Sequence, residues 1–349
     1  MPSRSCLQVA FLAAYGIVFI LAPAAAAPSD APGYDPGIAA LLDEVDGSEI
    51  RKTAYDLQNF STRAYGSDGN REAGEYIYQR LSAIPGLEVE FQGGEVHNVI
   101  ARLPGTNASS AEIVVVGAHY DSRSSDPARA PGVTDNGCGV AVVLELARVM
   151  SGHSFDRTVE FAFWNAEENG RHGSRRYVEN PPAPIALYLN YDSTCRGEGD
   201  RPRLNLLYDQ GARSAAELVV HHNTLYGTNF TLTRSAAPFI SDHISFWSRG
   251  YPALMAHALP QWPAHTPDDT IDQASFEFAE RNARLGLSVL ARVARMEGLV
   301  SPPPEGGSDP GVSWPMMPNW GANNRAEGNR CSLTSLQLSI NPTELCGCS

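Results

Sequence analysis

The sequence has little positive charge for its length. Lysine and arginine total 26 against 39 aspartates and glutamates, Lys52 is the only lysine, and the formal net charge is −13. This surplus of negative charge argues against nucleic acid and against an anionic membrane surface as partners. The 349 residues, 43% of them hydrophobic, provide enough apolar material for one large domain or two small ones.

Cysteine is also scarce. One of the six cysteines, Cys6, lies in an apolar N-terminal leader, and the five that remain imply a free thiol or an intermolecular bond. We expect Cys138 and Cys195, which are far apart in the sequence, to be small buried hydrophobic residues. We expect one disulfide among the cysteines that crowd the C-terminus, in an oxidising compartment. These are Cys331, Cys346 and Cys348.

Only one long apolar run is present, and it lies at the N-terminus. Arg4 precedes the segment LQVAFLAAYGIVFILA, and small residues follow in PAAAAPSD. This order is typical of a secretory signal peptide, and the run is short for a membrane span. We interpret residues 1–27 as a signal peptide and predict a secreted, extracellular or periplasmic protein without stable membrane insertion. A retained N-terminal anchor is the minor alternative.

The remainder divides into two parts by composition, and no internal repeat is evident. Residues 28–300 carry the periodic apolar patterns of a folded domain. Residues 301–349 are rich in proline, glycine and asparagine, as in PPPEGGSDPG and WPMMPNWGANN. Because this tail has little periodic apolar content, we expect a loosely ordered appendage or a small extension tied by a disulfide.

Helical and strand patterns alternate through the folded part. The expected helices are 38–62, 71–84, 139–150, 173–179, 214–226 and 274–296. The expected strands are 87–91, 96–103, 113–118, 159–164, 185–191, 204–208 and 252–255. Apolar strands that alternate with helices predict an α/β fold, with a mostly parallel mixed sheet covered by helices on both faces.

Histidines and carboxylates follow several of these strands. In open α/β sheets, ligands bind beyond the carboxyl ends of the strands. Neutral imidazoles and carboxylates are what zinc binds in a site without thiolates. Each residue alone is an ordinary loop or turn residue, but their joint occurrence indicates a metal site. Two histidines and three carboxylates at one edge of a sheet are enough for two zinc ions if one carboxylate bridges them. The full set of candidate residues is His119, Asp121, Asp135, Glu167, Glu168, Asp192 and His265.

These segments together resemble the secreted two-zinc aminopeptidases of the bacterial leucyl aminopeptidase and aminopeptidase Y type, which have the zinc exopeptidase (phosphorylase/hydrolase-like) fold. The matching segments are GAHYDS (117–122), GVTDNGCG (132–139), NAEENGRHGS (165–174), LNYD (189–192), SDHISFWSRGYP (241–252) and AHTPDDT (264–270). An upstream segment, FSTRAYGSDGNREAGEYI (60–77), is also similar to the N-terminal region of that family. The resemblance covers roughly residues 38–298.

The resemblance implies a cofactor of two zinc ions per chain. His119 and Asp192 would bind one ion, Glu168 and His265 would bind the other, and Asp135 would bridge the two.

Two further residues receive catalytic roles from the resemblance. Glu167 would be the general base, and Asp121 would hydrogen-bond the His119 imidazole and determine its tautomer. Thr134 stands where family members often have another acidic residue, but this is not a ligand position.

The implied function is a metallo-aminopeptidase that releases N-terminal amino acids from peptides with a free N-terminus. A preference for large apolar residues is a hypothesis from aromatic and aliphatic residues near the ligand segments, of which Phe246 is better explained by core packing. These residues are Tyr191, Phe239, Ile240, Phe246 and Trp262. We expect His221 and His222 to face solvent and His243 to support the site without binding metal. The sequence leaves the oligomeric state open and favours a monomer.

Two alternatives remain. Glutaminyl cyclases share the fold, the Thr-Asp of the loop and a helix like Leu144–Arg148, but they bind one zinc ion and cyclise N-terminal glutamine. The uninterrupted EENGRHGS and the unmodified DNGCG favour the peptidase. A non-catalytic binding ectodomain with the same fold is the second alternative, although such relatives tend to lose the metal ligands that are all present here.

Overall fold

The computed structural model describes residues 33–197, 199–234, 239–258 and 263–299. All of them belong to one compact unit of the chain, Met1–Met317. The predicted signal peptide, the tail and the disulfide among the C-terminal cysteines lie outside the described residues. Within the described ranges, no helix is long and apolar enough to cross a membrane.

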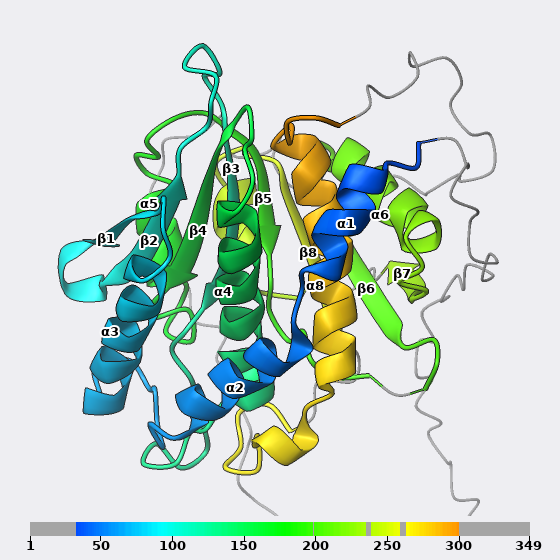
Figure 1. Ribbon diagram of the computed structural model, residues 1–349. Helices are drawn as coiled ribbons and strands as arrows, with labels where there is room; N and C mark the ends of the chain where they lie inside the picture. Colours follow the sequence, from blue (N-terminus) through cyan, green and yellow to red (C-terminus); the bar gives the residue numbers. More distant parts are fainter. Residues whose placement is uncertain (1–32, 198, 235–238, 259–262, 300–349) are drawn as a thin grey trace, which may run out of the picture. The chain divides into compact units, whose positions relative to one another are not determined.

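In the described part of the chain, eight strands form one sheet (Figure 1). They are β1 (Glu88–Gln92), β2 (Asn98–Leu103), β3 (Ile113–His119), β4 (Thr158–Trp164), β5 (Ile185–Asn190), β6 (Arg203–Tyr208), β7 (Thr231–Arg234) and β8 (Ala253–Ala258). The short edge strand β7 was not predicted. Its four residues are too few to show an apolar pattern of their own.

The α-helices surround this sheet. They are α1 (Pro36–Asp43), α2 (Gly47–Gln58), α3 (Asp68–Ser82), α4 (Cys138–Ser151), α5 (His172–Tyr177), α6 (Arg213–Leu225), α7 (His243–Trp247) and α8 (Phe276–Val293). The single helix predicted over 38–62 is wrong, because α1 ends at Asp43 and α2 begins anew after Asp46. The Asp46 side chain accepts a hydrogen bond from the Ser48 N–H and so caps α2.

The strand order is β1-β2-β4-β3-β5-β8-β6-β7. The neighbouring strands β4, β3, β5 and β8 are parallel, so their carboxyl ends meet at one edge of the sheet. The pairs β1–β2, β2–β4 and β6–β8 are antiparallel. The predicted α/β fold with a mixed sheet is confirmed, and the parallel centre explains why those strands are apolar along almost their whole length.

Apolar side chains cover both faces of the sheet. On one face, α4 and α8 lie over the strands (Figure 1), and α1, α2 and α3 add to the same large core. On the other face, a smaller core joins Trp164 of β4 and Tyr188 of β5 to Tyr177 of α5 and Phe246 of α7. The two buried layers hold the central strands rigidly, so their ends form a well-defined base for a site.

Candidate metal centre

The predicted site residues follow the carboxyl ends of the parallel strands. His119 is the last residue of β3 and is level with Trp164 of β4. Gly117 of β3 is paired with Asn190 of β5, which in turn is paired with Met255 of β8. Because the strands end side by side, the residues that follow them meet in one place.

The carboxylate of Asp135 lies between two groups of side chains. Its Oδ1 is 3.3 Å from His119 Nε2, and its Oδ2 is 3.2 Å from His265 Nε2. On the first side, Asp192 Oδ2 is 3.6 Å from His119 Nε2, and on the other side Glu168 Oε1 is 3.0 Å from His265 Nε2. The two groups therefore share one carboxylate and use different oxygens of it.

These spacings fit a pair of bound metal ions. Two ligand atoms on a tetrahedral zinc ion, at the usual zinc–nitrogen and zinc–oxygen distances, are about 3.3 Å apart. The potential ligand atoms of His119, Asp135 and Asp192 all lie within 4.8 Å of one another, as do those of Asp135, Glu168 and His265. Both groups combine imidazole nitrogen with carboxylate oxygen, a donor set that zinc accepts.

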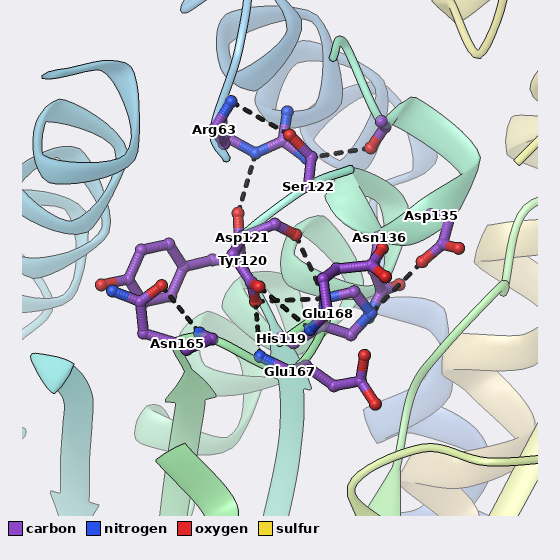
Figure 2. Close-up of polar contacts among 12 residues, drawn as sticks. Arg63, His119, Tyr120, Asp121, Ser122, Asp135, Asn136, Asn165, Glu167 and Glu168 are labelled. Carbon is purple, nitrogen blue, oxygen red and sulfur yellow. Dashed lines mark hydrogen bonds and ion pairs between the residues drawn. The ribbon is translucent and has the colours of Figure 1, made fainter. Parts of the chain in front are cut away.

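Glu167 and Glu168 lie beside this pair of groups (Figure 2). Both backbone N–H groups donate to the Asp121 carboxylate, Glu167 N to Oδ1 at 3.0 Å and Glu168 N to Oδ2 at 3.1 Å. Potential ligand atoms of Glu167, Glu168 and His119 lie within 4.8 Å of one another. Asp121 thus orients the turn that carries both glutamates.

Asp121 also faces the imidazole of His119. His119 Nδ1 lies 3.1 Å from the backbone carbonyl oxygen of Asp121 and 3.5 Å from its carboxylate Oδ1. The hydrogen bond to the carbonyl assigns the proton to Nδ1 and leaves Nε2 facing Asp135 and Asp192. Asp121 is therefore next to the imidazole, as predicted, but its carboxylate is mainly occupied by the two backbone N–H groups.

The loop that carries Asp135 is tied to its neighbours. Asp269 accepts hydrogen bonds from the N–H groups of Thr134 and Asp135 at 2.8 and 3.0 Å. Asn136 donates from Nδ2 to the Tyr191 carbonyl, directly before Asp192. Neither residue was assigned a role from the sequence, although both stand in the quoted motifs.

Cys138 and Cys195 form a disulfide bond, so the prediction of two separate buried thiols is wrong. Both side chains are buried, as expected. Their separation of 57 residues hid the pairing, because only the fold brings the start of α4 next to the loop after β5.

The clustered carboxylates of the site give it a negative charge that protons or metal ions must balance. Burial opposes a proton on His119, but the carboxylates of Asp121, Asp135 and Asp192 outweigh it and raise the pKa of His119 well above its ordinary value. Hydrogen bonds to Asp135 and Glu168 raise the pKa of His265 to about 10. In the chain alone, protons on the histidines thus compensate the clustered carboxylates, and metal ions would do so in their place.

Burial raises the pKa of Glu167 and Glu168, whereas burial alone would lower that of a histidine. It is the largest cause that raises the pKa of Glu167 to about 9, and the nearby carboxylates of Asp242, Asp192 and Glu168 add to it. Asp242 is itself buried, and burial raises its pKa to about 7. One unpredicted buried carboxyl, that of Asp242, therefore lies close to Glu167.

The three histidines that were predicted not to bind metal lie in different surroundings. His221 is exposed, but His222 is buried and its Nδ1 lies 2.9 Å from Ser288 Oγ, so the prediction that it faces solvent is wrong. His243 is buried against Trp247, and it belongs to none of the potential metal-binding groups among the described residues.

Of the residues considered for an apolar pocket, Tyr191 and Phe246 are in the core. Phe239 stacks on His257 with ring centroids 4.7 Å apart, and Ile240 is 64% exposed. Trp262 lies outside the described residues.

The chain is similar in sequence and in fold to known proteins. Residues 98–290 match peptidase family M28. Leucine aminopeptidase 1 of Arthroderma otae is 28% identical over 312 residues, which cover 78% of this chain and 80% of that protein. LapB from Legionella pneumophila has a TM-score of 0.65 and 22% identity, with 76% of each chain covered. Porphyromonas gingivalis glutaminyl cyclase has a TM-score of 0.58 and 18% identity, with 72% of this chain and 99% of that chain covered.

The fold is therefore that of the zinc exopeptidases, and solved structures with this fold include both aminopeptidases and glutaminyl cyclases. The family match covers more than half of the chain and confirms the resemblance that the motifs indicated. The chain belongs to peptidase family M28 and is a hydrolytic exopeptidase.

Proposed function

We propose that the chain is a secreted aminopeptidase that uses two zinc ions to release the N-terminal residue of peptides. The main support is the Asp135 carboxylate, whose two oxygens face two separate groups of potential ligands. Leucine aminopeptidase 1 of Arthroderma otae, at 28% identity, supports the reaction. Secretion rests on the signal-like N-terminus alone.

The residues divide the work as follows. His119 and Asp192 would hold one ion, Glu168 and His265 would hold the other, and Asp135 would hold both. When bound, zinc polarises the scissile carbonyl and makes a water molecule acidic near neutral pH. The Glu167 carboxylate accepts the proton of that water and delivers it to the leaving amine. A pKa above that of an ordinary glutamate suits delivery of the proton to the amine, and the positive charge of bound zinc would keep it low enough for Glu167 to be a carboxylate beforehand.

The free α-amine of the substrate is the feature that makes the enzyme an aminopeptidase. Four acidic side chains converge at the site, namely Asp135, Glu167, Glu168 and Asp192. With metal ions held by the other three, the Glu167 carboxylate would still attract a cationic amine and repel a C-terminal carboxylate. Peptides with a free N-terminus are therefore the expected substrates.

Metal content and product analysis of the purified full-length protein test this function. We expect two zinc ions per chain by elemental analysis, and release of one residue at a time from free peptides but not from N-acetylated ones. One zinc ion together with pyroglutamate formation from N-terminal glutamine would establish a glutaminyl cyclase instead. Full zinc loading without hydrolysis of any peptide would point to a non-catalytic binding protein.

A further inference from the structure

Arg63 is an arginine whose side chain lies entirely inside the protein. Its exposed fraction is 0%, and it stands in the upstream motif FSTRAYGSDGN, whose role the proposed mechanism leaves open. Among the described residues, no carboxylate forms an ion pair with it. Instead, the guanidinium donates to four backbone carbonyls: Nε to Tyr120 (2.9 Å), Nη1 to Pro131 (2.6 Å) and Leu57 (3.2 Å), and Nη2 to Gly132 (2.9 Å).

These carbonyls belong to the segments that carry the proposed metal ligands. Tyr120 directly follows His119, and Pro131 and Gly132 precede Asp135 by three or four residues. Leu57 is in the last turn of α2, which packs against the Asp135 loop. One planar group thus joins the end of β3, the Asp135 loop and a helix. Figure 2 shows its bond to the Tyr120 carbonyl.

The backbone of Arg63 strengthens the same connection. Its N–H donates to Ser122 Oγ at 3.0 Å, and its carbonyl accepts from the Ser122 N–H at 3.1 Å. Ser122 Oγ in turn donates to the Ala130 carbonyl at 2.7 Å. The segments 119–122 and 130–132 are therefore held to Arg63 by both its side chain and its main chain.

Neither Gly132 nor Arg63 can be replaced by another residue without disturbing these contacts. Gly132 has a φ of +51°, and a Cβ there would lie 2.7 Å from Ser122 Cβ and 3.2 Å from Arg63 Nη2. A lysine at position 63 has a single nitrogen with three donors, so it cannot reproduce four bonds that diverge in one plane. Burying an unpaired cation is costly, and the carbonyl bonds offset this cost only with the full guanidinium.

We propose that Arg63 is a positioning residue for the metal centre, holding the His119 and Asp135 segments at the separation that metal binding requires. This inference rests on the proposed two-zinc function. The positive charge of Arg63 by itself repels cations, so its contribution comes from geometry. Charge and geometry therefore predict opposite effects on metal affinity when Arg63 is replaced by a neutral residue.

The test uses zinc itself on the full chain, with Arg63→Lys, Arg63→Met and a control, Arg102→Lys. Arg102 of β2 forms an ion pair at 2.7 Å with the buried Glu160 of β4, away from the segments that carry the proposed ligands. Zinc dissociation constants are measured by competition with a chromophoric chelator, and the thermal stability of the zinc-free forms is measured in parallel. We expect both Arg63 variants to bind at least one zinc ion about tenfold more weakly, and Arg102→Lys to bind as the wild type does.

Different results separate the explanations. Folded Arg63 variants that bind two zinc ions with wild-type affinity would overturn the proposal, even if they unfold at lower temperature. Tighter binding by Arg63→Met would also overturn it, because the charge would then dominate.

If neither Arg63 variant folds, Ser122→Ala removes only the two side-chain hydrogen bonds of that residue. We expect it to weaken zinc binding by a few-fold, and unchanged affinity would refute the positioning role. A wild-type protein that binds one zinc ion would instead overturn the two-zinc function, whatever the Arg63 variants do.

Discussion

Cys138 and Cys195 are joined by a disulfide bond, and each follows a proposed zinc ligand by three residues. Cys138 begins α4 just after Asp135, and Cys195 lies in the loop just after Asp192. The bond therefore connects two ligands of the same proposed ion, those nearest to His119. The hydrogen bond from Asn136 to the Tyr191 carbonyl crosses the same gap.

Replacing both cysteines by alanine should destabilise the protein. It should also weaken binding of the zinc ion next to His119 more than binding of the other ion. The bond closes a loop of 57 residues, and loop entropy gives about 4 kcal/mol for its effect on the free energy of unfolding. Urea denaturation measures the first effect, and stepwise titration with zinc measures the affinity of each of the two sites. Equal loss of affinity for the two ions would contradict the special link to the His119 side.

Glu167→Gln and Glu168→Gln should produce two different defects, although the residues are neighbours. Glu167→Gln removes the proposed base, so we expect normal zinc content and a fall in kcat of about 10²–10⁴-fold. Glu168→Gln removes a charged ligand next to His265, so we expect loss of one zinc ion. Elemental analysis and peptide hydrolysis on both variants distinguish them, and identical defects would refute the division of roles.

Asp121→Asn should disturb the site through the turn that carries the glutamates. Asparagine has one side-chain oxygen where aspartate has two. One of the N–H groups of Glu167 and Glu168 therefore loses its acceptor. We expect a loss of about 10–100-fold in activity or zinc affinity. Asp126→Asn is the matched control, because Asp126 is exposed on the following loop. Wild-type values for Asp121→Asn would show that the two N–H bonds are dispensable.

Zinc loading at pH 7 should release protons. Without metal, the pKa of His265 is about 10 and that of His119 is raised well above its ordinary value. Both imidazoles are therefore in the positively charged form at pH 7. Metal binding requires the neutral ring, so at least the two imidazole protons should be expelled from each chain. Calorimetric titrations in buffers of different ionisation enthalpy count them. Buffer-independent heats would mean that the histidines are already neutral.

Acid should destabilise the fold partly through His222. Burial lowers its pKa to about 3 from the ordinary 6.5, so the unfolded chain takes up a proton first. The stability contribution of the neutral ring is complete above pH 6.5 and is lost as pH falls towards 3, by about 1.4 kcal/mol per pH unit.

Urea denaturation of the zinc-free protein from pH 7 to pH 4 tests this contribution. His222→Gln should reduce the slope of stability against pH, and His221→Gln, at the exposed neighbour, should not. Equal slopes for wild type and His222→Gln would rule out this role for His222.

Much of the fold could be predicted because strands and long helices have local patterns. The apolar runs that became β3, β4 and β5 were placed within one residue or two of their bounds. The failures lay where the pattern was short or interrupted. The turn between α1 and α2 depends on a single cap at Asp46, and β7 and α7 are too short for periodicity to show.

The chemistry of the candidate site was also largely readable, whereas the bonds that support it were not. Histidine and carboxylate after successive strands predict a metal site because parallel strands end at one edge. Nothing in the neighbourhood of Arg63 or Asp269 indicates that their side chains serve loops more than 50 residues away.

The sequence by itself determined the alternating fold, the family and which residue types stand at the strand ends. These are properties of neighbouring residues, and local hydrophobic periodicity and motif spacing encode them directly. Only the tertiary structure decided that Cys138 pairs with Cys195, that His222 is buried, and that the two oxygens of Asp135 face different histidines. Each of these depends on distances between residues far apart in the chain, which packing alone sets.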